Sequence, residues 1–181
     1  MMQLPLSTQT GQTGSKRIDS TYYVEGYATT FDTPYLLYEY DGVSYYEVID
    51  RNALIGADMS DVIMQYDHAG KVLARQTNDT LGLEADTKGL FIFADLSKST
   101  AAKDLYEEIS NGLITKMSWA FTVSNDTYDK ETHTRTILKI NKVYDVSAVS
   151  IPANAGTDIS ARSFVDGTIE MAAREESARR K

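Results

Sequence analysis

The sequence contains no cysteine, and only two histidines and three prolines occur among its 181 residues. Without cysteine the chain has no disulfide framework, no thiolate nucleophile and no cysteine-based zinc site. Basic residues are also in the minority, since 18 Lys and Arg stand against 26 Asp and Glu and the formal net charge is -8. A chain this acidic is repelled by nucleic-acid backbones and by anionic membranes, so we predict neither as a partner.

Long apolar runs are missing too. No hydrophobic stretch reaches the length of a membrane span, and the N-terminal residues lack the basic region and apolar core of a signal peptide. We therefore expect a protein that is made and used inside a cell. The sequence also lacks a glycine-rich phosphate loop, a His-Glu-x-x-His zinc motif and a Gly-x-Ser-x-Gly nucleophile elbow. Nucleotide hydrolysis, zinc-dependent proteolysis and the α/β-hydrolase fold lose support, and we predict no cofactor and no metal.

The length is sufficient for one well-buried domain. Residues 1–20, rich in Gln, Thr, Ser and Gly, predict a flexible N-terminal segment, and residues 164–181 predict a helical tail with a charged end. Between them, over residues 21–163, short runs of β-branched and aromatic residues alternate with turn residues. Most connections are short, which favours antiparallel pairing. We predict a mainly β (α+β) domain, an antiparallel β-barrel with surrounding helices.

Two local patterns within this domain have clear boundaries. Asp41–Gly42 separates two strand-like runs and predicts a tight hairpin turn. Ser97 or Ser99 opens the only strongly helical segment in the middle of the chain, and Asn111–Gly112 stops it. The apolar positions of this segment follow helical spacing, so we expect it to pack inward and assign it no chemistry.

Ser118 places a single hydroxyl inside an otherwise apolar, strand-like run, Ile114–Phe121. Strand alternation puts Met117 and Trp119 on one face and Ser118 on the other, among small or flexible neighbours that leave it accessible. A lone serine at a half-buried strand position is usually a packing residue. A nucleophile is the alternative, and it needs a base and a carboxylate elsewhere in the sequence.

Three side chains supply such a set. A serine hydroxyl becomes nucleophilic when a neutral imidazole removes its proton and a carboxylate holds the imidazole. Ser118, His68 and Asp145 fill these roles, with Asp158 as the reserve carboxylate. Asp67 is an inferior partner for His68, because adjacent strand residues point to opposite faces. The chain order His, Ser, Asp differs from the well-known serine hydrolase orders, so spacing alone establishes no triad.

Three segments together resemble a known family. They are Y-D-H-A-G-K-V-L-A-R at 66–75, G-L-I-T-K-M-S-W-A-F at 112–121 and V-Y-D-V-S-A-V-S-I-P-A-N-A at 143–155. In this order, from about Tyr23 to Ser163, the sequence resembles the prohead (capsid maturation) proteases of tailed bacteriophages, whose fold is similar to that of the herpesvirus assemblin proteases. The resemblance implies that His68, Ser118 and Asp145 carry catalysis.

The resemblance also implies a serine endopeptidase packaged inside the assembling procapsid in the host cytoplasm. Such an enzyme cuts the scaffold or the scaffold-like region of the major capsid protein, and also itself, and it can be a homo-oligomer. Many members of the family have Glu where this chain has Asp145, so the backbone has to approach His68 more closely here. Assemblins use a second histidine as the third residue, but His133 lies on a polar loop outside the matching segments.

Two alternative functions are compatible with the sequence, and the oxyanion donors have still to be assigned. A catalytically silent scaffold or capsid-binding protein of the same fold would keep the barrel without Ser118-dependent cleavage. An unrelated β-barrel binding module would hold His68, Ser118 and Asp145 far apart. The oxyanion donors that acyl transfer requires are expected among backbone amides near Ser118 or in the Pro152–Gly156 loop.

Overall fold

The computed structural model describes residues 16–152, 154 and 156–161, which form ten strands, one α-helix and one short 3-10 helix. The elements are β1 (Tyr23–Thr30), β2 (Tyr35–Tyr40), β3 (Val43–Ile49), β4 (Ile63–Tyr66), β5 (Ala69–Arg75), η2 (Gln76–Asn78), β6 (Leu81–Ala85), β7 (Gly89–Asp95), α2 (Thr100–Ser110), β8 (Lys116–Asp129), β9 (Thr134–Val149) and β10 (Asp158–Ala161). The fold is therefore mainly β, as the sequence predicts. The helix predicted for residues 164–181 lies outside the described residues.

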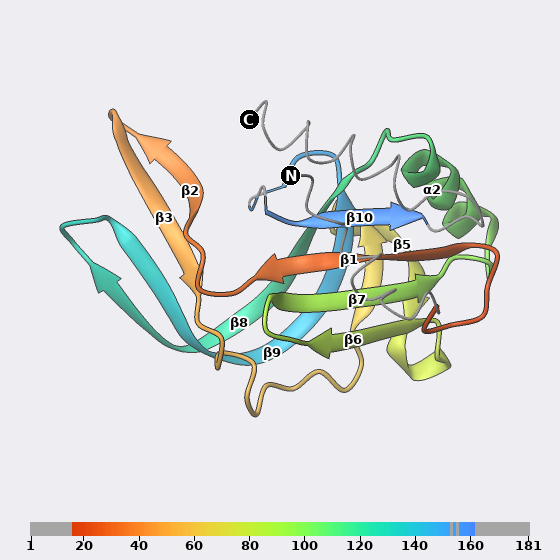
Figure 1. Cartoon of the computed structure of the whole chain (residues 1–181), viewed down its shortest axis with the longest axis horizontal. Helices are drawn as coiled ribbons and strands as arrows, with labels where there is room; N and C mark the ends of the chain where they lie inside the picture. The colour runs from red at the N-terminus through yellow and green to blue at the C-terminus, as the bar shows by residue number, and fades with distance from the viewer. Residues whose placement is uncertain (1–15, 153, 155, 162–181) are drawn as a thin grey trace.

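The strands form two sheets that lie one behind the other (Figure 1). The smaller sheet has the order β10-β1-β7-β6, and every neighbouring pair in it is antiparallel. The larger sheet has the order β2-β3-β9-β4-β5, and β8 also pairs with β9. The large sheet carries the candidate active site, so its strand pairing matters most.

Strand β9 organises the larger sheet. Its 16 residues run antiparallel to β8 along their whole length. The first part of β9 pairs in parallel with β3, and the last part pairs in parallel with β4. As a result β2, β3 and the far ends of β8 and β9 extend away from the smaller sheet, on the left of Figure 1, while β4 and β5 stay with the body of the domain.

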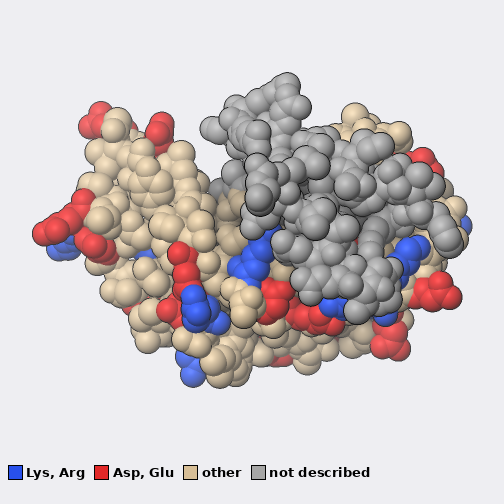
Figure 2. All heavy atoms as spheres, in the orientation of Figure 1, with Lys and Arg blue, Asp and Glu red and all other residues tan. Residues whose placement is uncertain are grey.

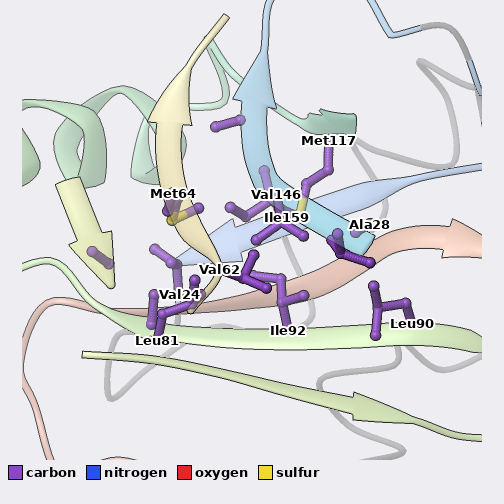
Figure 3. Close-up of a cluster of buried hydrophobic side chains, with 14 of the residues drawn as sticks. Val24, Ala28, Val62, Met64, Leu81, Leu90, Ile92, Met117, Val146 and Ile159 are labelled. Atoms are coloured by element: carbon purple, nitrogen blue, oxygen red, sulfur yellow. The ribbon is translucent and has the colours of Figure 1, made fainter. Parts of the chain in front are cut away.

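The core lies between the two sheets. Val24 and Ile92 from the smaller sheet and Met64, Met117 and Val146 from the larger one are all fully buried, and their side chains point into the same cluster (Figure 3). Alternation along each strand produces this packing, because every second residue faces the core. Burial of one such side chain stabilises the fold by about 1.5–3 kcal/mol.

Helix α2 closes one end of this core. The hydroxyl of Ser99 accepts a hydrogen bond from the N–H of Ala102 at 3.1 Å, which caps the helix start. Leu105 and Ile109 are buried in the cluster, and Gly112 follows the helix with a φ of 72°. A positive φ is typical of the glycine that ends a helix. The predicted helix and both of its boundary signals are confirmed.

The hairpin predicted at Asp41–Gly42 is confirmed, since both residues have positive φ and join β2 to β3. The predicted antiparallel β-barrel is not found in the described residues, which form two sheets and include two parallel pairings. Short connections favour antiparallel pairing only between strands that follow each other in the chain. β3 and β4 are both far from β9 in sequence, so that reasoning did not apply to them.

Charged side chains are mixed over the surface. On the face drawn in Figure 2, acidic and basic groups alternate, and the described residues show no continuous basic area there. No helix in the described part of the chain is long and apolar enough to span a membrane.

Candidate active site

His68 lies in the two-residue turn that joins β4 to β5. Tyr66 pairs with Ala69, so Asp67 and His68 are the central residues of the turn, with φ values of 49° and 57°. Positive φ at both positions is the pattern of a type I′ hairpin turn, which glycine and asparagine favour. For other residues this conformation costs about 1–3 kcal/mol each. Contacts around the turn therefore have to hold His68 in place.

Asp67 provides these contacts by fastening the turn to the end of β9. Its carboxylate accepts hydrogen bonds from the N–H of Ser150 at 2.9 Å and from the Ser150 hydroxyl at 2.9 and 3.1 Å. The Asp67 N–H donates to the carbonyl oxygen of Ala148 at 3.0 Å. The N–H of Ser150, and after it the Ser150 hydroxyl, hold the pKa of Asp67 below its usual value. Asp67 thus links the turn to Ser150, the residue that follows β9.

Asp145 meets the histidine ring because β4 and β9 run in parallel. Ile63 pairs with Asp145 and Tyr66 with Ala148, so the turn after β4 folds back over the face that carries Asp145. The distance from His68 Nδ1 to Asp145 Oδ1 is 2.6 Å. The Asp145 side chain is 10% exposed, whereas that of His68 is 35% exposed. An ionised Asp145 accepts the Nδ1–H of the ring and leaves Nε2 to act as a base.

Ser118 lies on the same face of the sheet. It pairs with Ser147, and its neighbour Ala120 pairs with Asp145, so all four side chains lie on one side of β8 and β9. Ser118 is half-buried, and its hydroxyl has no hydrogen-bond partner within the described part of the chain. Diagonal neighbours such as Ser118 and Asp145 are about 7–8 Å apart. That spacing accommodates one imidazole ring between a hydroxyl and a carboxylate.

The opposite face of β8 packs into the core, as alternation predicts. Met117 is fully buried in the cluster, and Trp119 packs against it. On the Ser118 face the neighbours along the strand are the small Ala120 and the buried Lys116, and Ser118 itself is half-buried.

Ser147 is a residue of this site that sequence reasoning missed. Its hydroxyl donates to Asp145 Oδ1 at 2.7 Å, the same oxygen that His68 Nδ1 approaches. Ser147 is completely buried. The spacing Asp145-Val146-Ser147 was the available signal, because residues two apart in a strand share a face.

The backbone amide of the residue after Ser118 is directed away from β9. The Met117 N–H donates to Thr157 Oγ1 at 3.1 Å, and Thr157 Oγ1 donates to the Met117 carbonyl oxygen at 2.6 Å. Met117 therefore directs its backbone groups away from β9. Because that direction alternates along a strand, the N–H of Trp119 also points away from β9. This amide belongs to the residue that follows Ser118.

The loop before β10 offers fewer free amides than expected. The N–H of Gly156 donates to Asn154 Oδ1 at 2.8 Å, and the N–H of Thr157 donates to the Asn154 carbonyl oxygen at 3.2 Å. Residues 153 and 155 lie outside the described residues. The amides of Gly156 and Thr157 are thus engaged within the loop itself.

The remaining sequence candidates lie elsewhere. His133 follows β8, where its ring contacts Tyr45 and its Nδ1 lies 3.3 Å from the Tyr128 hydroxyl. Asp158 belongs to β10 in the smaller sheet, where it pairs with Tyr27. The described residues contain no cluster of His, Asp and Glu suited to hold a metal ion.

A cavity of about 330 Å³ lies near the turn, between β5 and α2, and Asp104 and Glu108 are among the residues that line it. Tyr66 lines it as well and pairs with Ala148, which is buried in the core. Asp145 and Ser118 occupy the opposite face of the sheet. The cavity is therefore not part of the His68–Asp145 site.

Comparisons with known proteins identify the family of this chain. A family model described as caudovirus prohead serine protease matches residues 10–170, which include all three predicted site residues. The chain is also 29% identical over 144 residues to the prohead protease of Enterobacteria phage HK97. This match covers 79% of the chain but 61% of the relative, so the chain spans about three fifths of that protein's length.

Proposed function

The chain belongs to the caudovirus prohead serine protease family, and from this membership and the geometry around His68 we propose that it is a serine endopeptidase of procapsid maturation. The observation that carries the proposal is the 2.6 Å contact between His68 Nδ1 and the buried Asp145 carboxylate. This contact requires both the strained turn at His68 and the parallel pairing of β4 with β9. A conformation that costs free energy in this way is more typical of a functional site than of residues that only pack.

In the proposed mechanism Ser118 Oγ attacks the scissile carbonyl carbon while His68 Nε2 removes its proton. Asp145 keeps the ring in the Nδ1–H tautomer and stabilises the imidazolium. The tetrahedral intermediate collapses when Nε2 donates that proton to the leaving amine, so the C–N bond breaks and an ester on Ser118 remains. Water, deprotonated by the same Nε2, then hydrolyses the ester and releases the second product.

The negative oxygen of the intermediate requires a donor, and we assign this role to the N–H of Trp119. Two features support the assignment. The amide belongs to the residue after the nucleophile, and strand alternation directs it away from β9. Loss of one such donor typically costs about two to three orders of magnitude in rate.

The substrates we propose are the scaffold or the scaffold-like region of the major capsid protein, together with the chain itself. Cleavage takes place inside the procapsid, in the host cytoplasm. An assemblin-like fold, the absence of nucleic-acid and membrane partners, and a possible homo-oligomer belong to the same proposal. Its support is family membership and a formal charge of -8, which disfavours contact with DNA.

The test is co-expression of the chain with its capsid protein, followed by intact mass measurement of every product. Ser118→Ala should abolish ordered truncation of the capsid protein and of the chain. Ser124→Ala is the matched control, because Ser124 is exposed on the same strand and donates only to the Lys139 carbonyl oxygen. Cleavage that persists in Ser118→Ala refutes the nucleophile. Uncleaved, full-length masses for both wild type and variant favour the silent capsid-binding alternative.

A further inference from the structure

Ser147 occupies a position in the site for which the mechanism above has no role. It is fully buried, and so is out of reach of a peptide substrate. Ser147 is therefore not a second nucleophile, although it lies directly across from Ser118. We propose that Ser147 is a positioning residue, whose hydroxyl holds the Asp145 carboxylate toward His68.

The geometry supports this role through a shared oxygen. Ser147 Oγ donates to Asp145 Oδ1 at 2.7 Å, and His68 Nδ1 lies 2.6 Å from the same atom. Two donors on one oxygen fix the rotation of the carboxylate, because any turn of the group lengthens both hydrogen bonds. The second donor also provides a hydrogen bond to a carboxylate that is largely removed from water.

The sheet itself fixes the Ser147 hydroxyl. Asp145 and Ser147 are two residues apart on β9 and point to the same face. Hydrogen bonds of β9 to β8 on one side and to β4 on the other hold this segment. The hydroxyl is thus a rigid donor, whereas His68 belongs to a turn and its ring is partly exposed. A rigid second contact maintains the active arrangement when the turn moves.

The consequence for chemistry lies in the tautomer of His68. An aligned Asp145 keeps the neutral ring in the Nδ1–H form, which leaves Nε2 free to accept the Ser118 proton. With Ser147→Ala the carboxylate loses its fixed donor and can rotate, so part of the population should change to the Nε2–H form. The predicted effect on catalysis rests on the proposed function, whereas the predicted change of tautomer does not.

The experiment is nitrogen NMR of the full chain carrying Ser118→Ala, which prevents self-cleavage. The chain has two histidines, so His133 serves as an internal reference. The Nδ1–H form of neutral His68 should dominate in this background. Adding Ser147→Ala should raise the share of the Nε2–H form, and Ser147→Thr should restore the original ratio. If Ser147→Ala fails to fold, Ser147→Cys provides a weaker donor of similar size for the same comparison.

The second measurement is the cleavage rate of variants that retain Ser118. Ser147→Ala should lower kcat about tenfold with KM unchanged, because a hydrogen bond to a charged group is lost without loss of substrate contacts. Ser124→Ala is again the control. An unchanged tautomer ratio and an unchanged kcat, with only a lower Tm, would overturn the proposal. A shifted tautomer ratio in a chain that never cleaves capsid protein would support the positioning role and refute the protease.

Discussion

The change Asp145→Asn tests whether the buried carboxylate drives the chemistry of His68. The substitution keeps the size of the side chain and an oxygen that Ser147 can still bond. It removes the negative charge that lies 2.6 Å from His68 Nδ1. An asparagine amide can also donate to Nδ1, which selects the Nε2–H tautomer that cannot accept a proton from Ser118.

The size of the effect follows from the lost charge interaction. A carboxylate and an imidazolium with charge centres about 4 Å apart attract each other by ~4 kcal/mol at an effective dielectric constant of 20 and by ~1 kcal/mol in bulk water. The His68 ring is 35% exposed and Asp145 is 10% exposed, so the site lies between these limits. The rate should therefore fall by about tenfold to a thousandfold.

The assay is the initial rate of capsid-protein cleavage by purified variants, with thermal unfolding measured in parallel. Asp41→Asn is the matched control, because it makes the same chemical change in the exposed turn between β2 and β3. A rate within twofold of wild type for Asp145→Asn, with an unchanged Tm, would refute the assigned role. Loss of activity in Asp158→Asn instead would identify the reserve carboxylate as the partner.

Two further predictions concern the support of the site. Asp67→Asn should lower the free energy of unfolding at pH 7, because the Ser150 contacts depress the pKa of Asp67 in the folded state. That stabilisation is complete above the unfolded-state pKa of about 3.9 and is lost as pH falls through the lower folded-state value. The urea unfolding midpoints of wild type and variant should therefore converge as pH falls below the folded-state pKa of Asp67, and a difference between them that stays constant with pH would contradict the prediction. Met117→Ala should cost about 2–5 kcal/mol in chemical denaturation, whereas Ser118→Ala on the opposite face should cost less than ~1 kcal/mol; equal costs would contradict the face assignment.

Local sequence patterns predicted several parts of the fold. The turn at Asp41–Gly42 and the boundaries of α2 depend on backbone preferences of a few adjacent residues, and both are confirmed. Alternation along β8 correctly placed Met117 on the face opposite Ser118, and the structure shows that this face packs into the core at Met117. Such features need no knowledge of distant segments, which is why one sequence was sufficient.

The pairing of strands that are distant in the chain could not be predicted from local sequence patterns. The sequence predicted a closed antiparallel barrel, and the parallel contacts of β9 with β3 and β4 replace it. The candidate roles of His68 and Asp145 came from residue chemistry and from the family resemblance, but their contact depends on the register of β4 against β9. Ser147 was missed because a buried serine in an apolar strand looks like a packing residue until its partner is known.

The parallel pairing of β4 with β9 also has a consequence for the time at which activity appears. His68 and Asp145 are 77 residues apart in the chain, and no local contact can bring them together. Pairings that close such long loops lose more chain entropy and form slowly during folding. A ribosome that has released only β1 to β8 has made Ser118 and His68, the proposed nucleophile and base, but His68 still lacks Asp145 on β9. If Asp145 is the carboxylate partner that we propose, the order of the strands couples assembly of the site to completion of the domain and disfavours cleavage during synthesis.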